Sequence, residues 1–140
     1  MARKVAVNLT PRRISIIEVG PRDGLQSEPE ILSTESKIEF IRRAIDAGVR
    51  AIEVTSFVTP RKVPQMADTD RLFAHFAAPG KKPAGGVLSG LLLNAKGLER
   101  GFACGVELFC MGVSASETHS KKNTGMSIAD ANRRIVTMGK

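Results

Sequence analysis

Short runs of apolar and β-branched residues alternate along the chain with longer stretches in which apolar residues recur at helical spacing. The runs ISIIEV, VRAIEVT, VLSGLLL and VELFCM occupy residues 14–19, 49–55, 87–93 and 106–111. Glycine, proline or polar residues bound each run, which is typical of buried strands. The alternation therefore predicts βα units and a parallel sheet, that is, an α/β fold.

The first stretch with helical spacing follows a polar loop, and Ser33 or Thr34 is placed to cap it. Glu35 lies in its first turn, and Gly48 ends it. Apolar side chains recur at helical spacing at Ile38, Phe40, Ile41, Ala44 and Ile45. They predict the helix face that packs on the sheet.

Three further helices are predicted from weaker signals. Residues 70–77 indicate the second helix, and Asn94 is placed to cap a third that ends near Cys104. Ser127, with Asp130 three residues later, resembles a capping box that opens the last helix. The resulting four βα units fit either a small open α/β sheet or half of an eightfold barrel. A half barrel leaves its first and fourth strands without partners.

Composition narrows the class of protein without changing this fold. A length of 140 residues and 42% hydrophobic content suit one globular domain. The net charge of +7 invites a nucleic-acid hypothesis, but the cations are scattered and the chain has no Tyr or Trp for base stacking, so we expect no nucleic-acid partner. Cys104 and Cys110 lack metal-ligand spacing and are expected to be reduced thiols.

Nothing in the sequence predicts a membrane protein. It contains no run of about 18 apolar residues, and its start lacks the apolar segment of a secretory signal. A short, arginine-bearing start also occurs in organelle presequences, but here Pro11 interrupts it. We therefore expect a cytoplasmic location and no membrane partner.

Ionisable side chains follow the first predicted strand and lie near the end of the second. Arg22 and Asp23 come directly after Pro21, and Glu53 is followed by Ser56. Because the carboxyl ends of parallel strands meet at one rim, we expect the three ionisable groups to converge. A guanidinium there can hold a developing oxyanion, and a carboxylate can bind a hard divalent cation. An arginine–glutamate pair that only tightens the rim explains the same residues.

Three longer segments carry a family resemblance. EVGPRDGLQ, IEVTSFVTPRKVPQMAD and SETHSKKNTGMSI, in this order and spacing, closely resemble the amino-terminal half of the 3-hydroxy-3-methylglutaryl-CoA lyase family, whose members are metal-dependent TIM-barrel, or (β/α)8, carbon–carbon lyases. The resemblance implies that residues 14–140 form about the first four βα units of such a barrel, after an N-terminal extension over residues 1–13. It also implies the family's reaction in leucine degradation, retro-Claisen cleavage of hydroxymethylglutaryl-CoA to acetyl-CoA and acetoacetate.

The resemblance also implies roles for individual residues. Arg22 matches the arginine that polarises and stabilises the substrate oxygen, and Asp23 matches a ligand of the Mg²⁺ or Mn²⁺ ion. Gln26 matches a substrate-binding residue of the same loop. Glu53 matches an acidic residue that supports the arginine and the metal. The implied substrate is an acyl-CoA.

Two other matched residues have ordinary explanations. Asn94 matches a family asparagine, but a helix cap explains it equally well. His119 lies in a segment after the fourth strand that we expect to be a loop, with a solvated imidazole.

The chain departs from the family pattern in length. It stops after about four of eight βα units, before the family's His-x-His metal ligands, its asparagine ligand and its catalytic cysteine. Asp23 alone supplies one oxygen to an ion that takes about six ligands. We therefore expect a truncated half barrel that is inactive and aggregation-prone alone, with a homo-oligomer or a complementing carboxyl-terminal half as open partners. A non-catalytic half barrel and a related acyl-CoA condensing synthase remain alternative functions.

Overall fold

The computed structural model describes residues 13–140, so the predicted extension over residues 1–13 lies almost entirely outside the described part. The strands are β1 (Ile17–Glu18), β2 (Ala51–Ser56), β3 (Val87–Leu91) and β4 (Leu108–Cys110). The helices are α1 (Thr34–Asp46), α2 (Thr69–Ala77), α3 (Ala95–Ala103), α4 (Glu117–Thr124) and α5 (Ile128–Met138). A π-helical turn η1 (Gly20–Gly24) and a 3-10 turn η2 (Pro64–Met66) complete the elements.

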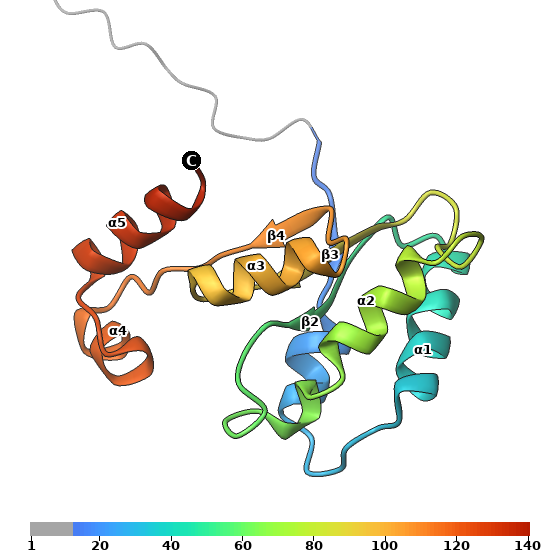
Figure 1. Ribbon diagram of the computed structural model, residues 1–140, viewed down its shortest axis with the longest axis horizontal. Helices are drawn as coiled ribbons and strands as arrows, with labels where there is room; N and C mark the ends of the chain where they lie inside the picture. Colours follow the sequence, from blue (N-terminus) through green and yellow to red (C-terminus); the bar gives the residue numbers. More distant parts are fainter. Residues whose placement is uncertain (1–12) are drawn as a thin grey trace, which may run out of the picture.

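The four strands form one parallel sheet in the order β1-β2-β3-β4. One of the helices α1, α2 and α3 connects each strand to the next, whereas α4 and α5 follow β4 and lie on the side away from α1 and α2 (Figure 1). The predicted parallel α/β arrangement is thus confirmed. Within the described residues β1 and β4 are the two edges of the sheet, as expected for a half barrel.

The edge strands are shorter than predicted. Of residues 14–19, only Ile17 and Glu18 pair with β2, and the side chains of Ile14 and Ile16 are exposed. β4 occupies only the middle of residues 106–111. An edge strand has a neighbour on one side only, so apolar residues beyond the end of that neighbour find nothing to pair with.

The core lies between the sheet and the first three helices. Ile52 of β2 and Leu88 of β3 pack in it with Ile41, Ile45, Val54, Phe57, Leu72, Phe73, Phe76, Leu92 and Val106. Side chains alternate along a strand, so Glu53 and Ser89, which follow Ile52 and Leu88, point to the opposite face of the sheet. β2 has one extra residue relative to β3 between Glu53 and Thr55.

The predicted apolar face of α1 is confirmed with one exception. Ile41 and Ile45 are buried, and Ile38 and Ala44 pack partly buried against the core. Phe40 is exposed, and its ring lies beside Gly20 of η1. Phe40 lies about 100° around the helix from Ile41, too far to share the face on the sheet.

Helix starts follow the predicted caps. The side chains of Ser33, Asn94 and Ser127 accept hydrogen bonds from the backbone amides of Ser36, Gly97 and Asp130. Between Ser33 and Thr34, which the sequence left open, the structure therefore selects Ser33. The described residues contain no helix that is long and apolar enough to cross a membrane.

The expected loop after β4 is wrong, because residues 117–124 form helix α4. Its cap is Ser116, which accepts from the amide of His119, and Gly125 ends it with a φ of 74°. The helix has the sequence ETHSKKNT, which contains no large apolar residue, so its sequence lacks the periodic signal from which a helix is predicted.

Candidate functional site

The sequence GPRDG folds into the tight turn η1 directly after β1. The backbone amides of Arg22 and Asp23 both donate to the carbonyl oxygen of Val19, at 3.1 and 2.7 Å. Pro21 is buried at the start of the turn, where a backbone N–H would have no partner within the turn, so the missing N–H of proline costs nothing. The turn therefore places the Arg22 and Asp23 side chains at the carboxyl end of the first strand.

Arg22 lies between two carboxylates. Its Nε donates to Oε1 of Glu53, and its Nη1 donates to Oδ1 of Asp23 at 2.6 Å. The side chains of Arg22 and Glu53 are 17% and 7% exposed, whereas that of Asp23 is 62% exposed. The predicted convergence of the three ionisable groups is therefore confirmed; their roles in a reaction stay predictions.

The two carboxylates that hold Arg22 differ in their exposure to solvent. Glu53 is buried on β2 and fixes the orientation of the guanidinium plane. Asp23 faces solvent, where a ligand can reach it. The two ion pairs use Nε and Nη1 of Arg22, so the guanidinium keeps further N–H donors for an incoming oxygen atom.

Two further groups near this pair were not singled out as site residues from the sequence. The Ser56 Oγ at the end of β2 is buried and has no hydrogen-bond partner within residues 13–140. Cys110 of β4 lies near Glu53, and burial raises the pKa of its thiol, with the Glu53 carboxylate adding to the rise. Neither residue has a sequence signal beyond its position at a strand end.

Within the described residues, no hydrogen bond joins the remaining predicted residues to Arg22. Gln26 is exposed beyond η1, and within the described residues no hydrogen bond joins it to the rim. The Oδ1 of Asn94 accepts from the amide of Gly97 at 2.8 Å, so Asn94 acts as the helix cap. His119 is exposed on α4, and its Nδ1 lies 3.0 Å from the hydroxyl of Ser114.

A metal ion does not find a complete set of ligands in this part of the chain. Asp23 offers one exposed carboxylate, but residues 13–140 contain no group of three His, Cys, Asp or Glu side chains that could hold a metal ion. A cation such as Mg²⁺ prefers a nearly complete shell of oxygen ligands.

A cavity in the described part of the chain lies away from this rim. It measures about 420 Å³ and is bordered by the segment after β3 and by α4 and α5. Its cationic lining residues are Lys62, Lys121, Lys122 and Arg134. Neither Arg22 nor Glu53 lines it, so the ion-pair site is an open rim and not the interior of this cavity.

Comparison with known proteins gives a consistent set of relatives. The HMGL-like family model matches residues 13–140. The mitochondrial hydroxymethylglutaryl-CoA lyase of Macaca fascicularis is 40% identical over 130 residues, which are 93% of this chain and 39% of that protein. The chain therefore spans about two-fifths of the length of the curated relatives it matches.

Solved structures agree. The crystal structure of the HMG-CoA lyase from Bacillus subtilis matches with a TM-score of 0.82 at 36% identity, over 92% of this chain and 42% of that one. An HMG-CoA lyase from Acinetobacter baumannii in complex with coenzyme A and 3-methylmalate matches with a TM-score of 0.79 at 31% identity, over 89% and 39%. The match confirms the prediction that the sheet corresponds to part of a (β/α)8 barrel.

Proposed function

The chain belongs to the HMGL-like family, and we propose that it supplies the arginine-bearing rim of a hydroxymethylglutaryl-CoA lyase active site. The observation that carries the proposal is the Arg22 guanidinium, which follows β1 and is held by exposed Asp23 in the same turn and by Glu53, buried within β2. Relatives named as hydroxymethylglutaryl-CoA lyases match nearly the whole chain. We propose an acyl-CoA, 3-hydroxy-3-methylglutaryl-CoA, as the substrate.

Arg22 has a defined task in the proposed reaction. Cleavage begins when a base removes the proton of the tertiary hydroxyl; the carbon–carbon bond then breaks to leave acetoacetate and the enolate of acetyl-CoA, whose carbon takes up a proton to give acetyl-CoA. Negative charge therefore develops on oxygen atoms of the substrate. A cation already oriented toward those oxygens stabilises the transition state without reorganising, and one such donor is typically worth about 10²- to 10³-fold in rate.

Glu53 acts on the substrate only through Arg22 in this proposal. Its buried carboxylate restricts the guanidinium to one orientation, so the entropy of ordering that side chain is lost before the substrate binds. It also compensates the arginine charge in the absence of substrate. Glu53 is thus a positioning residue, and Gln26 on the adjacent loop is proposed to contact the substrate.

We propose a requirement for Mg²⁺ or Mn²⁺, with Asp23 as one ligand. Such an ion would supply Lewis-acid stabilisation of substrate oxygens. Residues 13–140 contain no group of three side chains that could hold this ion. The roles given above to Arg22 and Glu53 are argued without the ion.

The decisive assay is acetoacetate formation from 3-hydroxy-3-methylglutaryl-CoA with Mg²⁺ or Mn²⁺. We expect the 140-residue chain to be inactive alone and active when mixed with the unmatched carboxyl-terminal part of the Bacillus subtilis lyase. Arg22→Gln should lower that activity at least about 100-fold. Arg43→Gln, which removes an exposed arginine that pairs with Glu39, is the matched control.

Three results would count against the proposal or its parts. A stable complex of the two segments that forms no acetoacetate would refute the proposed reaction. Equal activity of the two arginine variants would refute the role of Arg22. Metal-dependent cleavage by the 140-residue chain alone would refute the expected inactivity and show that the described residues suffice.

A further inference from the structure

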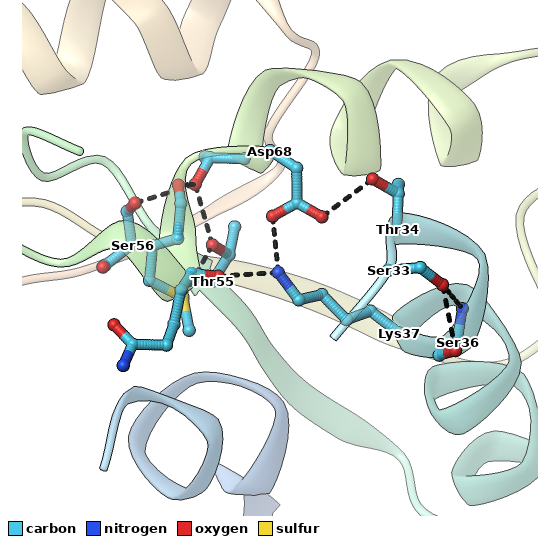
Figure 2. A network of polar contacts seen from close by, with 10 residues as sticks. Ser33, Thr34, Ser36, Lys37, Thr55, Ser56 and Asp68 are labelled. Atoms are coloured by element: carbon cyan, nitrogen blue, oxygen red, sulfur yellow. Dashed lines mark hydrogen bonds and ion pairs between the residues drawn. The ribbon is translucent and has the colours of Figure 1, made fainter. Parts of the chain in front are cut away.

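Lys37 is the most deeply buried charged residue of α1 within the described part of the chain. Its side chain is 3% exposed and that of its partner, Asp68, is 15% exposed. The Lys37 Nζ lies 2.6 Å from Oδ1 of Asp68 and also donates to the backbone carbonyl of Gln65 at 2.6 Å. Thr34 donates to the other carboxylate oxygen of Asp68 at 2.9 Å (Figure 2).

The acceptors of Lys37 both lie in the segment of residues 64–69, between β2 and α2. This segment contacts the loop that follows η1, because Nε2 of Gln65 donates to the carbonyl of Glu28 at 2.7 Å. It also contacts the end of β2, because the Thr69 hydroxyl lies 2.9 Å from the carbonyl oxygen of Ser56. Residues 64–69 thus touch the loop that follows η1 and the carboxyl end of β2.

The hydroxyl of Thr69 strengthens the second of these contacts. It lies 2.7 Å from the carbonyl of Met66 and 2.8 Å from the hydroxyl of Thr55, and all of these groups are buried. Figure 2 shows the chain of contacts running from α1 through Asp68 toward Thr55 and Ser56. The network therefore continues from α1 to Thr55 and Ser56, the last two residues of the strand that carries Glu53.

Stability alone is a poor reason for a buried ion pair. Replacing such a pair with apolar residues of similar size is often neutral or stabilising, because both charges lose their hydration. An apolar residue at position 37 would pack α1 against the 64–69 segment equally well. It would not, however, hold the Gln65 carbonyl, which only a donor can do.

We infer that Lys37 is a positioning residue, which fixes the 64–69 segment and, through it, the loop that follows the Arg22 turn and the end of β2, the strand that carries Glu53. The inference rests on the proposed function only in treating Arg22 and Glu53 as part of an active site; the contacts of Lys37 do not depend on it. It predicts that neutralising Lys37 and Asp68 makes residues 64–69 and the Arg22 side chain more mobile even where the fold is kept.

The test uses the full 140-residue chain and two readouts that need no substrate. The first is the ¹H–¹⁵N NMR signal of the Arg22 Nε–H group, which reports its ion pair with Glu53. The second is amide hydrogen exchange over residues 57–69. The variants are Lys37→Met, the double variant Lys37→Met/Asp68→Asn, Lys37→Arg as the conservative replacement, and Arg43→Gln as the control on the same helix.

Lys37→Met leaves the half-buried Asp68 carboxylate without its cation and is expected to lower the unfolding midpoint in urea. The double variant carries no charge at positions 37 and 68 and keeps an acceptor for Thr34, so its midpoint should recover. Its exchange over residues 57–69 should nevertheless stay at least about tenfold faster than in the native chain, because the bond to the Gln65 carbonyl is lost. Its Arg22 signal should shift or broaden, and Lys37→Arg should restore both readouts.

If the double variant shows native exchange and a native Arg22 signal, Lys37 has only a structural role and the inference is overturned. Should Lys37→Met fail to fold, the double variant carries the test. Because neither readout involves the reaction, failure here leaves the proposed lyase function standing. Conversely, an inactive complemented complex would refute that function without touching this result.

Discussion

Replacing Glu53 with alanine tests whether the rim ion pair is a buried interaction or a solvated one. The change removes the main partner of the Arg22 guanidinium, since Glu53 is 7% and Arg22 17% exposed. Removing one partner of a buried pair typically costs about 3–5 kcal/mol. Asp23 still contacts Arg22, but at 62% exposure such a pair recovers about 1 kcal/mol at most.

The expected loss in free energy of unfolding is therefore about 2–4 kcal/mol for Glu53→Ala. Glu53→Gln keeps the shape and an acceptor for Nε but loses the charge assistance, so we expect a cost of about 1 kcal/mol. The measurement is urea denaturation of the 140-residue chain near neutral pH, followed by circular dichroism. Asp23→Ala is the matched control and should cost about 1 kcal/mol or less.

A double variant completes the design. Removing both charges with Arg22→Met/Glu53→Ala should be less destabilising than the sum of the single changes, because neither member of the buried pair is then left without its partner and Asp23 is exposed. The reasoning fails if Glu53→Ala costs no more than Asp23→Ala. In that case water compensates the guanidinium, and Glu53 does not orient it.

Other parts of the molecule give three further predictions. Gly101→Ala should lower the free energy of unfolding in urea by about 1–2 kcal/mol, because a Cβ at this position would lie 2.3 Å from Cε1 of Phe109. This overpacking should outweigh the higher helix propensity of alanine, and a stabilised variant would contradict the close approach. Asn94→Ala should cost about 1 kcal/mol through loss of the α3 cap, and no change would mean that the cap is not formed in solution. Burial lowers the pKa of His75, and the charges of Arg42 and Lys81 lower it further. The contribution of neutral His75 to stability is therefore present above about pH 6.5 and is lost as the pH falls. The urea midpoint should decline from about pH 7 to about pH 5, and it should decline less steeply in His75→Gln.

Local signals in the sequence predicted most of the elements. Ser33, Asn94 and Ser127 cap helices as expected, because a cap is a hydrogen bond to an amide three residues away and needs no tertiary partner. Helix α4 was missed because it contains no large apolar residue to signal a periodicity. The length of β1 was overestimated, since its pairing depends on where β2 begins and not on its own residues.

The rim was predictable for a different reason. Parallel strands all end at one side of the sheet, so the order of the chain alone brings Arg22, Asp23 and Glu53 together. The sequence did not determine which carboxylate is buried. That depends on which face of β2 Glu53 occupies, and on the exposure that η1 leaves to Asp23.

Lys37 marks the limit of what the sequence by itself determined. A lysine at this position predicts an exposed helix face, because a cation is costly to bury without partners. Its partners are the Gln65 carbonyl and the Asp68 carboxylate, 28 and 31 residues further along the chain. Periodicity and caps are local and can be predicted from neighbouring residues, whereas only the packing of α1 against residues 64–69 brings these acceptors within reach of Lys37 and makes its burial favourable.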